Sequence, residues 1–236
     1  MPELMLNSYR IREIADATIG QNWETELYGY VDRLRLKSNI VSEFASEHER
    51  NRQGRRNFIR LCFTAKRYSD SILSHNTEEE MDSAINSLPS CESDPERSIA
   101  LFTALRGAPQ EVLLDLAYEM MHFSYPGTYG LATRWVWNPL TGTGALRETI
   151  VAEKRAIGFE QLQKVMKSIS SSLAVHGYRF SDFLPIDLIS ALYYSQDVIG
   201  ARDNSMNAGG MEALFPNHGV ISMMILGIRG IHHANP

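Results

Sequence analysis

The chain has few cysteines and no apolar run long enough to cross a membrane. Cys62 and Cys91 are its only cysteines, and their spacing matches no metal-binding or redox motif, which argues against a disulfide framework and favours a reducing compartment. The longest apolar run, residues 219–231, is too short to span a bilayer and contains Arg229. The N-terminus shows no apolar segment of the signal-peptide type. We therefore expect a soluble, cytoplasmic protein with no membrane partner.

Alternating polar and apolar residues, which are typical of half-buried strands, are scarce as well. Apolar residues instead recur at the spacing of amphipathic helices. We expect helices at residues 22–47, 55–74, 77–87, 109–124, 158–177 and 181–198. The segment RETIVAEK, residues 147–154, is ambiguous, and we assign it to a helix. The sequence predicts an all-α protein built as a compact multi-helix domain.

One segment suggests a division of the chain. Residues 86–98, NSLPSCESDPERS, are rich in serine, proline and acidic residues and predict a loop or linker. The chain then consists of an N-terminal helical lobe, residues 1–90, packed on a C-terminal helical lobe, residues 98–236. A chain of this length also fits one single domain. Further loops are expected at residues 138–146 and 200–219, and the second is long enough to be mobile or functional.

The charge is unevenly distributed along the chain. The formal net charge of −5 gives no general attraction to nucleic acid. Residues 33–67 nevertheless contain ten Lys or Arg against three Glu, whereas residues 78–96 contain seven Asp or Glu and no basic residue. The two segments are either surfaces for different partners or helix faces that attract each other, and we favour the second interpretation.

The stretch HFSYPGTYGLATRWVWNP, residues 122–139, is the densest in aromatic residues. We expect a helix to end near Ser124, a turn at Pro126 and Gly127 in which Gly127 is free to take a positive φ, and then a second helix or a single turn of one. An architectural explanation is that the aromatic rings fill a gap between helices and loops. Trp135 and Trp137 are two positions apart, so on a helix they cannot both face the same core.

A ligand pocket is the alternative explanation for this stretch. Arg134 and His122 would supply polar groups among aromatic walls, as in many ligand sites. The amides of residues 141–146, TGTGAL, would hold an anion together with Arg147. The ligand-binding residues would then be Tyr129, Arg134, Trp135, Trp137 and Arg147.

The turn HFSYPGTYGLATRW resembles the helix-hairpin-helix element of base-excision DNA glycosylases. Tyr125-Pro126-Gly127 matches the start of that hairpin, but Gly130 stands one position later than the family pattern requires. The resemblance covers about twenty-five residues of the 236. Near the position of the family's catalytic aspartate, this chain has Glu148 after a glycine-rich loop that the family lacks. The resemblance implies that the hairpin amides and Arg134 hold a DNA phosphate, with Arg50 and nearby arginines adding charge. The nucleic-acid-binding residues would be Arg52, Arg55, Arg56, Gly127, Gly130 and Arg134.

Acidic residues on the predicted helix 109–124 are the remaining candidates. Asp115 and Glu119 are four residues apart and share one face. Glu119 and His122 match half of the Glu-x-x-His pattern of di-iron bundles, but a convincing second copy is missing. We therefore predict no metal and no cofactor, and we favour a solvated face for these side chains. Asp187, in the first turn of its helix, suits the helix dipole without a catalytic role.

These observations favour a non-catalytic, intracellular helical accessory or interaction protein. Its working surface would lie around residues 122–147, and its partner would be another protein. One alternative is a DNA-binding or glycosylase-like protein that uses the hairpin and Glu148. A second is a small-molecule or metal-dependent enzyme that uses Glu119, His122 and Arg134. Whether the protein is an enzyme stays open at this point.

Overall fold

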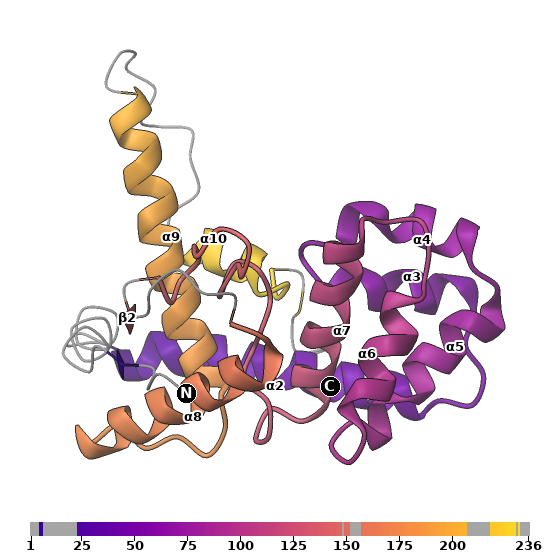
Figure 1. Ribbon diagram of the computed structural model, residues 1–236, viewed down its shortest axis with the longest axis horizontal. Coiled ribbons are helices and arrows are strands. Elements are labelled where there is room, and N and C mark those ends of the chain that lie inside the picture. Colours follow the sequence, from indigo (N-terminus) through magenta and orange to yellow (C-terminus); the bar gives the residue numbers. More distant parts are fainter. Residues whose placement is uncertain are drawn as a thin grey trace.

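The computed structural model describes residues 5–6, 23–147, 149–151, 157–206, 218–229 and 231, and helices make up most of this part of the chain (Figure 1). They are α2 (Trp23–Ser46), α3 (Arg52–Leu61), α4 (Ser69–His75), α5 (Glu78–Asn86), α6 (Pro95–Thr103), α7 (Gln110–Ser124), α8 (Phe159–Val175), α9 (Leu184–Met206) and α10 (His218–Ile225). Two 3-10 turns are η1 (Lys66–Tyr68) and η2 (Leu88–Ser90), and β1 (Met5–Leu6) pairs antiparallel with β2 (Ile150–Val151). The all-α prediction is confirmed.

Local side-chain chemistry sets several helix starts. Thr77 forms a capping box at α5: its hydroxyl accepts from the Glu80 amide, and the Glu80 carboxylate accepts from the Thr77 amide. Asn51 caps α3 through a hydrogen bond from the Gly54 amide. Asp94 accepts from the Arg97 amide at the start of α6. Each cap satisfies an amide that has no partner within its own helix.

The helices form two groups that share one long helix. Helices α3 to α7 gather on one side of the molecule, and α8, α9 and α10 gather on the other (Figure 1). Helix α2 reaches both groups, because it contacts α3, α5 and α7 as well as α9. Buried apolar side chains form one cluster that draws residues from both of the predicted lobes, 1–90 and 98–236. The two lobes therefore share a hydrophobic core.

Several local expectations need correction. The predicted helix 55–74 is divided into α3, η1 and α4, and the predicted loop 86–98 contains η2 and the first turn of α6. Within residues 147–154, Ile150–Val151 is a strand, while residues 148 and 152–154 lie outside the described part. Gly127 does not have a positive φ. Residues 131–147 form turns and no second helix, so the hairpin lacks the element that should follow it.

The basic and acidic segments contact each other. Arg55 places its Nη2 2.7 Å from Asp82 and its Nη1 3.1 Å from Glu78. Arg50 is buried, and its Nη1 lies 3.6 Å from the same Asp82 carboxylate. These ion pairs join α5 to the start of α3 and match the interpretation of two mutually attracting faces.

Among the described residues, no helix is both long enough and apolar enough to cross a membrane. Helix α2 has 24 residues, but charged side chains interrupt it. Helix α9 has 23 residues and contains Asp187, Asp197 and Arg202.

Gly227 offers a test of how the chain after α10 packs. Its φ is +69°, and a Cβ there would overlap the carbonyl oxygen of Leu61 at the end of α3. We expect Gly227→Ala to lower the free energy of unfolding by at least about 1–3 kcal/mol, the usual cost of such a backbone conformation. Gly29→Ala is the control, because Gly29 is exposed in α2 with open space around it. That change should stabilise the helix by about 0.5–1 kcal/mol. Urea unfolding measures both values, and equal stability of the two variants would contradict the packing described.

Candidate functional site

Helix α7 carries three buried polar side chains. Asp115, Glu119 and His122 are 2%, 1% and 0% exposed. They stand four and three residues apart, so they follow one side of the helix. The prediction of a solvated face for these residues is therefore wrong. Burial of three ionisable groups on one helix requires a partner for each of them, and each one pairs with a different segment of the chain.

Glu119 pairs with Lys37 of α2, which is fully buried. The Lys37 ammonium donates to Glu119 Oε1 at 2.5 Å, to the Leu226 carbonyl at 2.7 Å and to the Leu61 carbonyl at 2.9 Å. These three bonds use all three ammonium protons. The Lys37 nitrogen also lies 4.1 Å from the centre of the Phe123 ring. One lysine thus connects α2, the end of α3, α7 and the chain after α10.

Burial changes the acid–base properties around this pair. It raises the pKa of Glu119, and the Lys37 ammonium offsets part of that rise. It also raises the pKa of Cys62 well above its ordinary value, with the neighbouring Glu119 charge adding to the effect. Burial brings the pKa of Cys91 to about 12. Both thiols therefore stay protonated at neutral pH, and neither suits a nucleophilic role.

His122 pairs with Asp187 of α9. Both side chains are fully buried, and His122 Nε2 lies 2.9 Å from Asp187 Oδ2. The two atoms are in ion-pair contact, and neither has another partner among the described residues. His122 Nδ1 lies 2.7 Å from the Tyr129 carbonyl, and the Leu131 amide donates to Asp187 Oδ1 at 3.3 Å. The pair therefore joins α7, the hairpin of residues 125–131 and α9.

Asp115 pairs with Arg134. The Arg134 backbone amide and its side-chain Nε each donate to one Asp115 oxygen, both at 2.9 Å. Burial raises the pKa of Asp115, and the amide and guanidinium of Arg134 offset part of that rise. Glu111 lies 3.8 Å from Arg134 Nη1, and the arginine side chain is 33% exposed. The guanidinium is thus held against α7 and carries two acidic neighbours.

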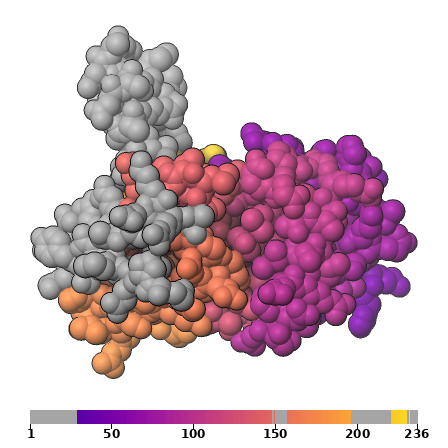
Figure 2. Space-filling view, in the orientation of Figure 1, coloured from indigo at the N-terminus to yellow at the C-terminus, as the bar shows by residue number. Residues whose placement is uncertain are grey.

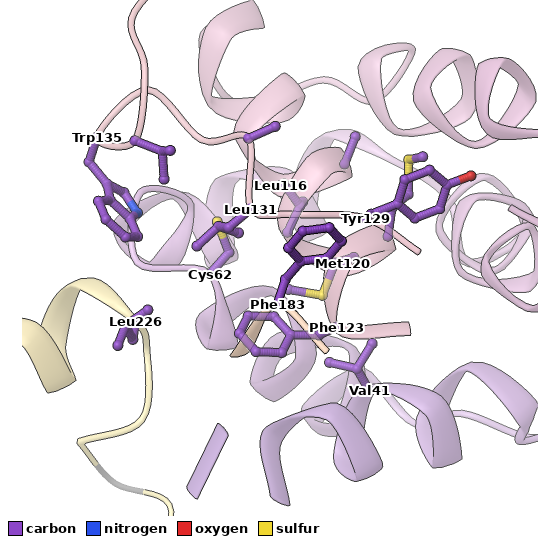
Figure 3. Close-up of a cluster of buried hydrophobic side chains, with 14 of the residues drawn as sticks. Val41, Cys62, Leu116, Met120, Phe123, Tyr129, Leu131, Trp135, Phe183 and Leu226 are labelled. Atoms are coloured by element: carbon purple, nitrogen blue, oxygen red, sulfur yellow. The ribbon is translucent and has the colours of Figure 1, made fainter. Parts of the chain in front are cut away.

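The aromatic candidates belong to the core. Tyr129, Trp135 and Trp137 are 8%, 7% and 6% exposed. Figure 3 shows Tyr129 and Trp135 among buried apolar side chains of several helices. The Tyr129 hydroxyl donates to the Cys91 carbonyl at 2.8 Å. The indole N–H groups of Trp135 and Trp137 are buried without a hydrogen-bond partner among the described residues. These rings fill space as the architectural explanation proposed, and they form no open aromatic wall.

The hairpin amides are already used within the protein. The Gly130 amide donates to Gln163 Oε1 at 2.7 Å, and the Gly130 carbonyl accepts from Gln163 Nε2 at 2.9 Å. The amides of Thr128 and Tyr129 both donate to the Tyr125 carbonyl. Gly127 is exposed, with open space around it. The hairpin residues therefore form a folded turn, and the Gly130 amide is not available to bind a phosphate.

The remaining DNA-binding candidates are dispersed. Arg55 is buried in its ion pairs with α5, and Arg56 pairs with Asp70 of α4. Arg52 is exposed. Glu148, the candidate for the catalytic position, lies outside the described residues. Arg55 and Arg56 thus neutralise nearby carboxylates.

Residues 138–147 form a braced turn at the surface, hereafter the 138–147 turn. The amide of Asn138 donates to the Thr143 carbonyl at 2.7 Å, and the Asn138 side chain accepts from the Leu140 amide at 3.0 Å. Gly144 has a φ of +124°, and a Cβ there would lie 2.5 Å from the Val136 carbonyl oxygen. At the tip, Leu140 is 88% exposed. Arg147 is exposed at the base. This segment reaches the molecular surface in Figure 2, coloured salmon.

A small apolar pocket lies beneath this turn, between α8 and α9. Among the described residues, no charged side chain lines it, and its polar side chains carry hydroxyls. Its lining consists of Ala145, Leu146, Thr149, Ile169, Leu173, Ile186, Ile189, Ser190 and Tyr193. Apart from the Tyr193 phenol, none of these lining side chains is titratable. Across the described residues, no group of three or more His, Cys, Asp or Glu side chains is placed to hold a metal ion.

Lys37 and Gln163 are important residues that the sequence analysis did not single out, and Asp187, which it assigned to the helix dipole, pairs with His122. Lys37 does have a signal: it falls between Leu34 and Val41, both fully buried, on the apolar stripe of α2. A lysine on such a stripe requires a buried acidic partner. Asp187 likewise stands within an apolar run. The sequence does not show which partner each one takes, because the partners are 82 and 65 residues away.

The Lys37–Glu119 pair predicts strong non-additivity between substitutions. Lys37→Met leaves the Glu119 carboxylate buried and unpaired, and Glu119→Leu leaves the ammonium in the same state. Each should lower the free energy of unfolding by about 3–5 kcal/mol. The double variant removes both charges and should lose far less than the sum of the two, as measured by urea unfolding. Arg35→Met, in an exposed ion pair with Asp32, is the control and should have little effect. Additive losses would show that the two side chains do not depend on each other.

Comparison with known proteins gives no relative from which a function could be transferred. No protein family, curated protein or solved structure matches the chain. The function is therefore inferred from the geometry of its own residues.

Proposed function

We propose that this protein is a non-catalytic adaptor that binds another protein through the 138–147 turn. The observation that carries the proposal is the 88% exposure of Leu140 on a turn whose backbone is fixed. Exposed apolar side chains are common on protein surfaces when they stand alone on flexible loops. Here the protein holds one leucine at the tip of a hydrogen-bonded turn, which supports a role in recognition.

The rigidity of the turn favours binding. Its amides are fixed by the Asn138 side chain and by backbone bonds from Ala145 to Trp135 and from Leu146 to Val136. The buried indole rings of Trp135 and Trp137 anchor one arm in the core. A segment that is ordered before binding loses less conformational entropy when a partner immobilises it. Leu140 then acts as an apolar anchor for a pocket on the partner.

Charge around the turn specifies the partner further. Arg147 is exposed at the base of the turn, and Arg134 is one-third exposed on the opposite arm. Two cationic side chains beside an apolar tip complement an apolar pocket with an acidic rim. Asp115 and Glu111 accompany Arg134, so among the described residues Arg147 is the cation that we expect to contribute more to such a contact.

The non-catalytic part of the proposal is supported by the state of the catalytic candidates. Glu119 and His122 are occupied by Lys37 and Asp187 in the interior. Groups that are fully buried in ion pairs with other protein segments have no access to a substrate. The thiols of Cys62 and Cys91 are buried and protonated. Among the described residues, the turn therefore contains the most exposed large apolar side chain of the candidate region, Leu140.

Site-specific photo-cross-linking tests this proposal. The photoreactive residue p-benzoyl-phenylalanine is placed at position 140 in one sample and at position 175 in another, in native cells. Val175 is a matched control, because it is 84% exposed at the end of α8. We expect a discrete cross-linked protein from position 140 and not from position 175. With that protein purified, Leu140→Asp should weaken binding more than about tenfold, since a carboxylate would enter an apolar, acid-rimmed pocket. Val175→Asp should leave the affinity unchanged.

Two outcomes would overturn the proposal. One is the same pattern of cross-linked products from both positions, which indicates random collision. The other is a partner whose affinity is unaffected by Leu140→Asp, because the turn would then not be the contact surface.

A further inference from the structure

The His122–Asp187 pair requires a proton that the rest of the core does not supply. His122 Nδ1 lies 2.7 Å from the Tyr129 carbonyl, which only accepts hydrogen bonds, so Nδ1 carries a hydrogen. Nε2 lies 2.9 Å from an Asp187 oxygen. If neither atom carried a proton, a nitrogen lone pair would face a carboxylate in a site closed to water. The pair therefore holds one proton between Nε2 and Oδ2, as an imidazolium facing a carboxylate.

We propose that the His122–Asp187 pair is a proton-dependent latch that holds α9 and the 125–131 hairpin against α7. With its proton, the pair has no net charge. Without the proton, it leaves one uncompensated negative charge in the interior, where an unpaired ion is strongly disfavoured. Asp187 also accepts from the Leu131 amide, and His122 donates to the Tyr129 carbonyl. Deprotonation leaves both of these bonds their donor and acceptor, but it drives His122 and Asp187 apart, which strains the hairpin bound to both of them and weakens the contact with α9.

The surrounding charges neither supply nor replace this proton. From α2, the Lys37 ammonium disfavours a charged His122, but it is itself bonded to Glu119. Ahead of α9, Asp182 favours a protonated Asp187. The Tyr129 hydroxyl donates to the Cys91 carbonyl and does not face the pair. From α8, the neutral Gln163 side chain is bonded to Gly130.

The direction of the pH effect follows from the pair itself. Burial alone lowers the pKa of His122, but the facing Asp187 carboxylate more than offsets this, so its pKa lies above the ordinary 6.5. Burial likewise raises the pKa of Asp187. A folded-state pKa above the unfolded value means that the folded protein binds the proton more tightly. The stabilisation is complete below about pH 6.5 and is lost as the pH rises through the raised pKa of the pair.

Asp187→Asn is the informative variant. An asparagine keeps the shape of the side chain, and its oxygen accepts from the Leu131 amide. Its amide donates to the lone pair of a neutral His122, so the contact no longer requires an extra proton. Asp187→Asn therefore removes the proton shared by residues 122 and 187 while it keeps a hydrogen bond between them.

Two measurements test the latch. Nitrogen-15 NMR of the seven histidine rings, with His122 assigned from its absence in His122→Gln, should show both ring nitrogens of His122 protonated at pH 7. In Asp187→Asn, the ring should become singly protonated. The urea midpoint of the native protein should fall between pH 6 and pH 9, whereas that of Asp187→Asn should fall clearly less. His176→Gln, at an exposed position, is the control and should follow the native profile.

The latch would be overturned by either of two results. A His122 ring that carries a single proton in the native protein at pH 7, beside an ionised Asp187, would remove its basis. Equal slopes of the urea midpoint against pH in the native protein and in Asp187→Asn would show that the pair does not control the stability. Both results are independent of the proposed binding through the 138–147 turn.

Discussion

The need to pair three buried ionisable groups on α7 constrains the rest of the structure. Asp115 holds Arg134, Glu119 holds Lys37, and His122 holds Asp187. Apolar burial is non-directional and allows helices to slide past one another with little change in area. A buried charge permits no such freedom, because a shift that separates it from its partner is heavily penalised. α7 therefore fixes the positions of α2, α9 and the segment that leads into the 138–147 turn.

The aromatic stretch after α7 is positioned by the same pairs. Arg134, between Tyr129 and the two tryptophans, is fastened to Asp115 through both backbone and side chain. The hairpin before it is held by Gln163 at Gly130. In the folded structure the tryptophan rings lie in the core, and Gly144 allows the chain after the turn to approach Val136 closely. The turn reaches solvent, with Leu140 at its tip.

Sequence periodicity predicted most of the helices, because one helix face repeats along the chain whatever it packs against. The helix expected at 109–124 is α7, Gln110–Ser124, within one residue. Turns and pairings were harder to predict. Gly127 was expected to take a positive φ, whereas within this stretch Gly142 and Gly144 have one. The bend lies there because the amides of Ala145 and Leu146 bond back to the carbonyls of Trp135 and Val136. The partners of Glu119 and His122 are distant in sequence, so only the folded chain identifies them.

The three pairs on α7 differ in the side chain that partners each carboxylate, and this difference bears on how each contact responds to pH. Lys37 is bonded to a carboxylate and two carbonyls, which engage all three of its ammonium protons. Arg134 binds Asp115 through its backbone amide as well as its side chain. Histidine is the one partner whose proton exchanges near neutrality. With the proposed latch, α9 is therefore joined to α7 by a contact that depends on the proton concentration.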